Sequence, residues 1–473
     1  MDLVRESFNK YRLKRTGQMQ VDCLVYASAA LLSLVRRDKS LVQLANAACL
    51  PGVVGPVCGM PDIHEGFGLP IGGVMATSPD GVISAGAVGM DINCGVRLLA
   101  TNIPARELKA PFLRRLIERI EGYVPTGVGK KSRHKRITPG IFEEVVHTGS
   151  PGIVEHGFGW PEDPENTEEE GCLPGADLAA VSREATKRGS LQLGTLGGGN
   201  HFIELQLVEE VFDPAVGSVF GLWPGQLAVM IHTGSRGFGH QICTDYSKSH
   251  LPVAKKYGID LPDRGLACAP ADSREGQAYY AAMACAVNFA FANRQVITHD
   301  VRLAFADLFG QPPEELGLNV VYDVAHNIAK WEFHGGRRVL VHRKGATRAL
   351  PPGHGDNTLR YRETGHPVLI PGSMGTASYI LVGTECTAES FYSVNHGAGR
   401  VLSRTAASKE ISKEQFEASM GQVLYNTRNF MELLDEAPGA YKDIDEVVDT
   451  LAAIGKTRKV ARLRPLAVIK GKD

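Results

Sequence analysis

Three histidines stand beside short strand-like runs, at points where the chain turns. His201 follows LGTLGGG, His232 precedes TGSRGFGH, and His326 follows LNVVYDVA. We interpret each run as a β-strand that ends at its histidine, which would project the imidazole from a rigid element into the layer of loops. Taken singly, such a histidine is more often a hydrogen-bonded structural residue. Three in the same context indicate a metal site.

A carboxylate and a thiol in GMDINCGVR could complete such a site. Asp91 and Cys94 lie three residues apart between two glycines. Carboxylate, thiolate and imidazole together suit Mn²⁺, Fe²⁺, Co²⁺ or Zn²⁺, and a thiolate can bridge two ions. Taken alone, the segment is better explained by a buried cysteine and an aspartate in a turn. The three histidines shift this balance, because imidazoles that bind a transition metal need an anionic partner.

A further histidine, His396, lies in SVNHGAGR, where Gly397 and Gly399 follow it and Arg400 comes four residues later. Small residues leave room for a phosphoryl group, which the guanidinium could neutralise in bidentate fashion. The pattern indicates a nucleophile or a phosphate-binding loop, although an ordinary turn explains HGAG equally well. The loops at 371–378 and 197–200 offer backbone N–H groups and hydroxyls of the kind that bind phosphate.

The common nucleotide and zinc-protease motifs do not occur. PTGVGKKS is a near miss for a Walker A motif, which would need glycine in place of Val124 and Ser or Thr in place of Lys131, so we interpret it as a basic surface loop. No GxGxxG opens a helix after a strand, and HExxH is absent. The residues therefore favour a metal enzyme that handles phosphates without being a P-loop NTPase or a Rossmann dehydrogenase.

The elements that must hold these residues are short strands that alternate with helices. Strand-like runs such as LAVMIHT, RRVLVHRK, PVLIP and SYILVG stop at polar or glycine-rich turns. Helical periodicity is found at 273–292, where Asp272 and Glu275 resemble a capping box, and at 413–434 and 443–454.

These elements show no regular βαβ period, and no repeat or linker separates them. We therefore predict a mixed α/β (α+β) fold, with one large catalytic domain of mixed sheets and flanking helices over residues 1–473. Residues 1–20 are a candidate flexible N-terminus. The run PEDPENTEEE, residues 161–170, is interpreted as a solvated acidic loop.

The overall charge limits the contacts that are possible. With 51 Lys and Arg against 52 Asp and Glu, any nucleic acid must be bound by a local cationic cleft. The first residues lack the apolar stretch of a signal peptide, and the longest nearly apolar run, from Ala278, is too short to span a membrane. We expect a cytoplasmic protein without a membrane segment, whose nine cysteines are reduced thiols.

Eight motifs, taken in order, resemble those of RtcB-type RNA ligases, the tRNA-splicing ligases that join an RNA 3′-phosphate or 2′,3′-cyclic phosphate to a 5′-hydroxyl. They are MPDIHEGFGLPIGGVMA, GMDINCGVR, QLGTLGGGNHFIE, HTGSRGFGH, DVAHN, HRKGATRA, PGSMGTASYIL and NHGAGR. The similarity covers roughly residues 20–473. It implies an RNA ligase that depends on GTP and two Mn²⁺ ions and that works in tRNA splicing or RNA repair.

The resemblance also assigns roles to residues. The metal ligands that it implies are Asp91, Cys94 (which would bridge both ions), His201, His232 and His326. His396 would be the nucleophile that takes GMP from GTP and passes it to the RNA 3′-phosphate, after which the 5′-hydroxyl expels GMP. Asp62 and His64 match a segment close to the site, and we expect them to support it.

Further positions match contacts to GTP and RNA. The implied GTP contacts are Asn200, His201, Phe202, Ile203, Glu204, His326, Asn327, Pro371, Gly372, Ser373, Met374, Ser378, His396, Gly397, Ala398, Gly399, Tyr441 and Lys470. The implied RNA contacts are Arg188, Arg236, Lys344 and Arg400. Among the GTP contacts, Tyr441 is a candidate to stack on guanine. The terminal segments look closer to the archaeal and animal branch, whose members often work with archease, a small acidic activator.

Two other functions compete with this reading. The same Asp, Cys and His set could activate water in a dinuclear phosphoesterase, from which covalent labelling by GTP would distinguish a ligase. An RNA-binding module with a structural metal is disfavoured, because structural zinc ligands are usually closely spaced and these span residues 91 to 326. The sequence is compatible with several RNA substrates: tRNA halves, an unconventionally spliced messenger and damaged RNA.

Overall fold

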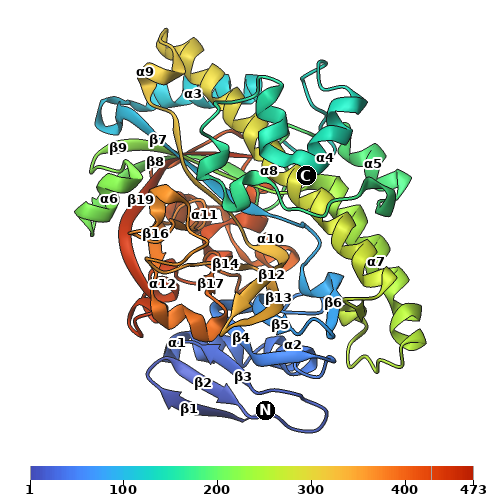
Figure 1. Cartoon of the computed structure of the whole chain (residues 1–473). Coiled ribbons are helices and arrows are strands. Elements are labelled where there is room, and N and C mark those ends of the chain that lie inside the picture. Colours follow the sequence, from blue (N-terminus) through green and yellow to red (C-terminus); the bar gives the residue numbers. More distant parts are fainter. Residues whose placement is uncertain (1, 428, 472–473) are drawn as a thin grey trace.

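Two large β-sheets form the centre of the computed structural model, which describes residues 2–427 and 429–471 (Figure 1). The eight-stranded sheet has the order β11 (Asn319–Ala325), β7 (Gly95–Pro104), β9 (Gln226–Thr233), β8 (Phe202–Val211), β19 (Thr457–Lys470), β16 (Ser378–Gly383) and β15 (Val368–Ile370), with β18 (Leu424–Tyr425) parallel to β19. The strands predicted at LAVMIHT, LNVVYDVA, PVLIP and SYILVG all belong to this sheet. The mixed α/β fold is thus confirmed.

The seven-stranded sheet contains most of the N-terminal region. Its order is β1 (Leu3–Ser7), β2 (Lys10–Leu13), β3 (Cys23–Tyr26), β4 (Val53–His64), β5 (Ile71–Thr77), β13 (Arg337–Lys344) and β12 (Asn327–His334). Residues 3–13, within the candidate flexible N-terminus, form the antiparallel hairpin at its edge. Two small sheets pair β6 (Val82–Ser84) with β10 (Cys268–Pro270) and β14 (Ala346–Arg348) with β17 (Ser393–Asn395).

Hydrophobic cores cover both faces of the eight-stranded sheet. Successive residues of β7, Leu98 and Leu99, point to opposite faces and pack into different cores. One core includes Ile297 of the long helix α8, and the other includes Phe416 from the C-terminal part of the chain. Burial on both faces explains why these strands read as nearly continuous apolar runs.

The helices surround the sheets, and most of those on the right in Figure 1 pack around α8. They are α1 (Ala29–Val35), α2 (Ser40–Ala47), α3 (Ala110–Tyr123), α4 (Pro139–Glu155), α5 (Arg183–Gly189), α6 (Pro214–Phe220), α7 (Arg236–Lys256), α8 (Arg274–Phe309), α9 (Pro313–Leu316), α10 (Arg404–Glu410), α11 (Lys413–Met420) and α12 (Ile444–Ala452). Among the described residues, no helix is both long and apolar enough to cross a membrane.

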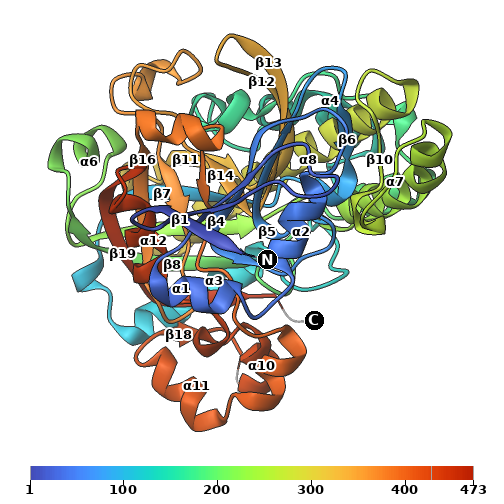
Figure 2. The ribbon, with the colours of Figure 1, turned by 90° about the horizontal axis from the view of Figure 1, so that it is seen from below.

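Two predicted helices differ from those observed. Helix α8 begins after Ser273, whose side chain accepts a hydrogen bond from Gly276 N, so the predicted cap at Asp272 is one residue too early. The predicted helix 413–434 is wrong, because α11 ends at Met420 and Gly421 follows with φ of 53°. Helices α10 and α11 instead form a small lobe that projects from the body (Figure 2).

The acidic run 161–170 is only partly solvated: Glu162, Glu165 and Glu170 are exposed as predicted, but two other carboxylates are not. Asp163 and Glu168 are almost fully buried. Asp163 accepts two hydrogen bonds from Arg302, at 2.6 and 2.7 Å, and Glu168 accepts one from Ala325 N at 2.8 Å and pairs with Lys330. The run therefore neutralises buried cations and holds the end of β11, next to a predicted metal ligand.

Candidate active site

Strand register brings the predicted metal ligands to one edge of the eight-stranded sheet. Gly95 of β7 lies opposite both Thr233 of β9 and Ala325 of β11, and Phe202 of β8 lies opposite His232. Because neighbouring strands are only about 5 Å apart, residues that flank these pairs must lie close together.

The predicted ligand atoms meet at this edge of the eight-stranded sheet, which we call the ligand edge. Sγ of Cys94 lies 3.5 Å from Nε2 of His201 and 3.2 Å from Nε2 of His232, which in turn is 3.3 Å from Nε2 of His326. Oδ2 of Asp91 lies 2.8 Å from Nε2 of His201. These atoms form two sets that could each hold a metal ion and that share the thiol: Cys94 with His232 and His326, and Cys94 with Asp91 and His201. One detail differs from the prediction, since His201 precedes β8 and does not end a strand.

Local contacts prepare these groups for metal binding. Nδ1 of His232 is 3.1 Å from Asn200 O and donates to it, so the lone pair on Nε2 faces Cys94. Burial lowers the pKa of His232 and His326, so both imidazoles are neutral, as metal ligands must be. Burial and the charge of Asp91 raise the pKa of the Cys94 thiol well above its usual value. A thiolate at this position therefore requires a compensating cation.

Asp91 has a partner that the sequence analysis did not single out. Nε2 of His240 lies 3.7 Å from Oδ1 of Asp91, and the His240 side chain is 46% exposed. Burial would raise the pKa of Asp91, but the charges of His201, His240 and Arg236 outweigh it and hold that pKa below its ordinary value. His240 ends the motif HTGSRGFGH, yet nothing in the sequence relates it to Asp91.

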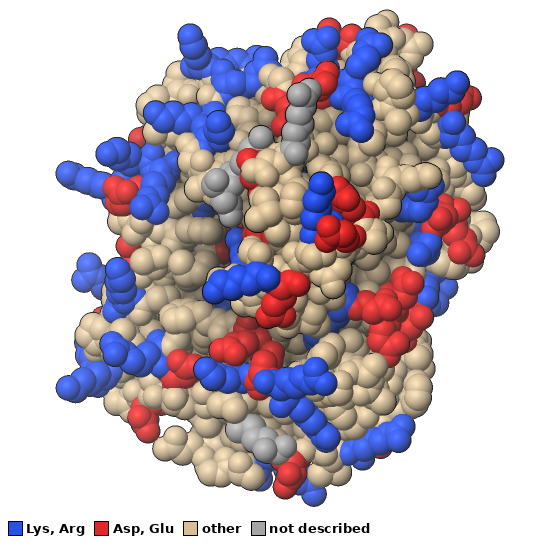
Figure 3. All heavy atoms as spheres, turned by 180° about the vertical axis from the view of Figure 1, so that it is seen from behind, with Lys and Arg blue, Asp and Glu red and all other residues tan. Residues whose placement is uncertain are grey.

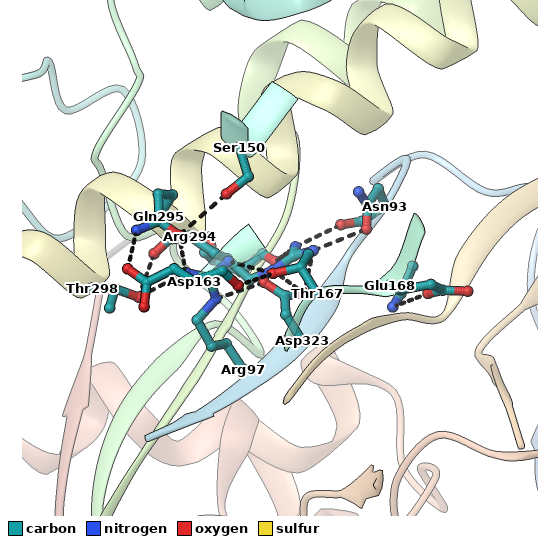
Figure 4. A network of polar contacts seen from close by, with 12 residues as sticks. Asn93, Arg97, Ser150, Asp163, Thr167, Glu168, Arg294, Gln295, Thr298 and Asp323 are labelled. Atoms are coloured by element: carbon teal, nitrogen blue, oxygen red, sulfur yellow. Dashed lines mark hydrogen bonds and ion pairs between the residues drawn. The ribbon is translucent and has the colours of Figure 1, made fainter. Parts of the chain in front are cut away.

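A buried ion network stands behind the ligand edge (Figure 4). Nη1 of Arg294 donates to Asn93 O at 2.9 Å and to Thr233 O at 2.8 Å, and each of these residues adjoins a predicted ligand. Asp323 accepts from Nε of Arg294 at 2.9 Å and from Nε of Arg97 at 2.7 Å. All of these side chains are buried. The sequence offers one signal for this role, which is that Arg294 is a charged residue within an apolar helix.

His396 is held by Asp62. Its backbone N and its Nδ1 both donate to Oδ2 of Asp62, at 3.0 and 2.7 Å, which leaves Nε2 available. The His396 ring centroid is 4.7 Å from that of His326, so the candidate nucleophile adjoins the ligand edge. Gly399 has φ of 73°, and a Cβ there would lie 2.2 Å from Asp62 O. Only glycine allows this approach.

Lys442 fixes the segment that carries Asp62, and the sequence analysis did not identify it. Its Nζ donates to Pro61 O at 3.1 Å and to Ile63 O, and its backbone N donates to Gly399 O at 2.9 Å. Burial lowers the pKa of Lys442 to about 8. The lysine thus joins the end of β4 to the loop that follows the candidate nucleophile.

A cavity of about 380 Å³ connects the ligand edge with His396. The predicted residues that line it are Asp91, Cys94, Asn200, Phe202, His232, His326, Asn327, Lys344, Pro371, Gly372, Ser373, Met374, His396, Gly397, Ala398, Gly399, Arg400, Tyr441 and Lys470. Residues that line it without having been predicted include Phe67, Met90, Arg404 and Glu436.

Glu436 is the centre of a charged cluster on the cavity wall. Its carboxylate lies 3.1 Å from Arg400 Nη1, 3.4 Å from Arg404 Nε and 3.5 Å from Lys470 Nζ, and it accepts from the hydroxyl of Tyr441. Burial alone would raise the pKa of Glu436, but these cations outweigh it and lower that pKa. One buried carboxylate thus gathers three cations and an aromatic ring at the cavity.

Four predicted GTP contacts are not part of the lining: the predicted metal ligand His201, and Ile203, Glu204 and Ser378. Gln206 Nε2 donates to Glu204 at 2.7 Å and to Ser378 Oγ at 3.0 Å, and Gly372 N donates to the same hydroxyl at 3.3 Å. Burial raises the pKa of Glu204 to about 8. The side chain of Ile203 packs into the core on the α3 side of the sheet. The side chain of Ile203 therefore lies away from the cavity.

Three of the four predicted RNA contacts are engaged inside the protein. Nη1 of Arg236 lies 3.3 Å from Nδ1 of His201, Lys344 donates to Gly86 O at 3.2 Å, and Arg400 joins the Glu436 cluster. Arg188 is exposed and lies outside the cavity lining.

Comparisons with known proteins show the family of this chain. Residues 43–471 match the family model described as tRNA-splicing ligase RtcB. Relatives with that name from Aeropyrum pernix and Thermococcus kodakarensis are 47% and 46% identical to this chain over 462 residues, which is 96% of the chain and 96% and 95% of the relatives. The RNA-splicing ligase RtcB of Mycobacterium tuberculosis is 47% identical over 438 residues, which is 91% of this chain and 100% of the relative. The chain belongs to the RtcB family.

Proposed function

We propose that this chain is an RNA ligase that uses GTP and Mn²⁺ to join RNA 3′-phosphate or 2′,3′-cyclic phosphate ends to 5′-hydroxyl ends. The observation that carries the proposal is the position of His396: Asp62 engages its Nδ1, its Nε2 is available, and its ring adjoins the ligand edge. Neutral imidazole is a competent nucleophile near pH 7.

The donor atoms suit two manganese ions. Cys94 belongs to both ligand sets, with Asp91 and His201 on one side and His232 and His326 on the other. Thiolate, carboxylate and imidazole form a mixed donor set appropriate for a borderline divalent ion. When bound, the ions would neutralise phosphate charge and polarise the phosphorus.

In the first step, Nε2 of His396 attacks the α-phosphorus of GTP. A nitrogen–phosphorus bond forms, the bond to the β-phosphate oxygen breaks, and pyrophosphate leaves. The proton on Nδ1 stays on the ring, where its hydrogen bond to Asp62 stabilises the positive charge that develops. Arg400 and Lys470 line the same cavity and can hold phosphate oxygens.

In the next two steps, GMP moves to the RNA and is then expelled. An oxygen of the RNA 3′-phosphate attacks the guanylyl phosphorus and releases His396. The 5′-hydroxyl of the second strand attacks the activated 3′-phosphate, loses its proton, and displaces GMP. A 2′,3′-cyclic phosphate must first be opened by water to a 3′-phosphate.

The base of GTP would be held by Tyr441 and Glu204. Tyr441 offers an aromatic face on the cavity wall, and Glu204 has an Oε1 without a hydrogen-bond partner among the described residues. An amino-bearing base could satisfy that oxygen. We further propose tRNA halves or broken RNA as substrates, archease as a partner, and the cytoplasm as the location.

The test is covalent labelling. Pure protein with Mn²⁺ and GTP labelled at the α-phosphate should form an adduct that is stable in alkali and labile in acid, as expected for a phosphoramidate. His396→Ala should keep the metal and form no adduct. An adduct that maps to a lysine would contradict the assignment. Release of phosphate from RNA without any adduct would instead indicate the dinuclear phosphoesterase.

A further inference from the structure

An RNA strand is longer than the cavity, so its backbone must continue over the surface. Of the four RNA contacts implied by the resemblance, only Arg188 is exposed. Arg236, Lys344 and Arg400 are engaged by groups within the protein. Other surface cations are therefore needed to neutralise the phosphates outside the cavity.

The segment 125–136 starts at the site and leads away from it. It contains five Lys or Arg residues and no Asp or Glu. Gly127 N donates to Leu196 O at 3.0 Å, and Ser132 N donates to Leu191 O at 2.8 Å, so the segment follows the loop that leads to His201. Arg236, beside the ligand edge, donates to Gly127 O at 3.4 Å.

The far end of this segment opens into a cationic hollow. A cavity of about 270 Å³ between α3 and the segment is lined by Arg115, Arg119, Arg133 and Tyr123, with Glu118 as its one acidic lining residue. The Arg133 guanidinium lies 4.5 Å from the centre of the Tyr123 ring. Outside the lining, Asp307 pairs with Arg119 at 3.0 Å. The hollow therefore keeps a surplus of positive charge.

Three exposed lysines lie along the same path. Lys130, Lys131 and Lys135 are exposed, and the structure records no ion pair for them within the described residues. The side of the molecule that carries α4 and α5, on the right in Figure 1, is the left margin in Figure 3, where Lys and Arg predominate.

We propose that Arg115, Arg119, Lys130, Lys131, Arg133 and Lys135 form a basic track that holds the phosphodiester backbone of a single-stranded RNA end. The seven residues from Gly127 to Arg133 span at most roughly 20 Å, so the track connects the site wall to the hollow within a few nucleotides. Phosphate contacts of this kind position a strand without reading its sequence. The inference rests on the proposed function only in taking RNA as the substrate.

Fluorescence anisotropy with a labelled single-stranded RNA tests the track. The variant Arg115→Ala/Arg119→Ala/Arg133→Ala should bind a 12-nucleotide RNA more weakly, and the slope of log affinity against log salt should fall by about 2, since each single-strand phosphate contact contributes about 0.7. Self-guanylylation should stay at the wild-type level. The control Arg36→Ala/Arg37→Ala changes exposed arginines next to α1, which lies at the opposite end of the molecule from α3 in Figure 1.

Two further experiments test whether the charge of the arginines matters and how far the RNA must extend from the cavity. Arg→Lys changes at the same three positions keep the charge and should retain most of the salt slope. A single ribonucleoside 3′-phosphate is too short to reach from the cavity to the hollow, so the Ala variant and wild type should bind it alike. Wild-type RNA affinity and salt slope in the Ala variant would overturn the track. Failure of wild type to form the guanylylated adduct would instead overturn the proposed function, and the RNA-binding comparison would still decide on the track.

Discussion

The ligand edge and the opposite wall of the same cavity are positioned by different means. The ligand edge is set by the register of adjacent strands and by the buried guanidinium of Arg294, whose charge Asp323 balances. The wall is built from loops, a 3-10 helix (Phe430–Glu436) and the end of β19, where Glu436 gathers Arg400 and Lys470. Sheet register fixes distances whether or not a ligand is bound, whereas ion pairs in a wall can exchange partners when a phosphate enters. The geometry of the ligand edge should therefore survive substitutions elsewhere in the chain. Residues of the wall should be replaceable without moving the ligand edge.

The largest effect is expected from Cys94→Ala, because this thiol belongs to both ligand sets. The variant should lose bound manganese and guanylylation together, by about 100-fold or more, while remaining folded, since a chain of this size does not depend on an ion for its core. Metal analysis, adduct formation and circular dichroism measure the three quantities. Normal metal content and ligation in this variant would disprove the proposed site.

The next largest effect is expected for Arg294→Ala. Removing one partner of a buried ion pair costs about 3–5 kcal/mol, and Asp323 would keep only Arg97 as a cationic partner. Metal affinity should fall as well, since Asn93 and Thr233 lose their shared donor. Denaturant unfolding and metal titration measure both, with the exposed Arg274→Ala on the same helix as control. Equal stability of the two variants would show that the network does not hold the edge.

Asp62→Asn should slow guanylylation without affecting metal binding at the ligand edge. Asparagine can still accept from Nδ1 of His396 but carries no charge to stabilise the imidazolium, so guanylylation should slow by about 10- to 100-fold. Manganese content should not change. The exposed Asp80→Asn is the matched control. Loss of metal in Asp62→Asn would mean that the two regions are coupled more closely than their contacts indicate.

The smallest effect, measured per pH unit, concerns the stability of the unliganded protein. The pKa of Glu204 is raised from 4.5 to about 8, so the folded state binds more protons than the unfolded state between these values. Stability is therefore fully present below pH 4.5 and is lost as pH rises towards 8, by up to about 1.4 kcal/mol per pH unit. Glu204→Gln should flatten this slope in urea unfolding from pH 5 to 8, and the exposed Glu210→Gln should not. An unchanged slope would refute the buried state of Glu204.

The same contrast shows what the sequence could predict. Motifs such as GMDINCGVR contain the ligands themselves, and strand-like runs show which elements present them, so the ligand edge could be anticipated. Glu436, Lys442 and His240 could not, because their roles depend on contacts with residues far away in the chain.

The prediction that the acidic run 161–170 is solvated was wrong in part for a related reason. Composition predicts exposure for clustered carboxylates. Burial of Asp163 and Glu168 depends on Arg302 and Lys330, more than 130 residues later in the chain. The end of helix α11 was missed because a single glycine with positive φ, Gly421, outweighed the periodicity that follows it.

Strand β19 has a consequence for how the protein is made. It lies between β8 and β16, and it ends at Lys470 on the cavity wall. During synthesis, which proceeds at about 5–20 residues per second, the ribosome has produced every ligand and the nucleophile before this strand exists. Until residues 457–470 leave the exit tunnel, β8 and β16 lack their shared neighbour. A nascent chain therefore cannot complete the cavity, so the proposed capture of GTP must follow translation.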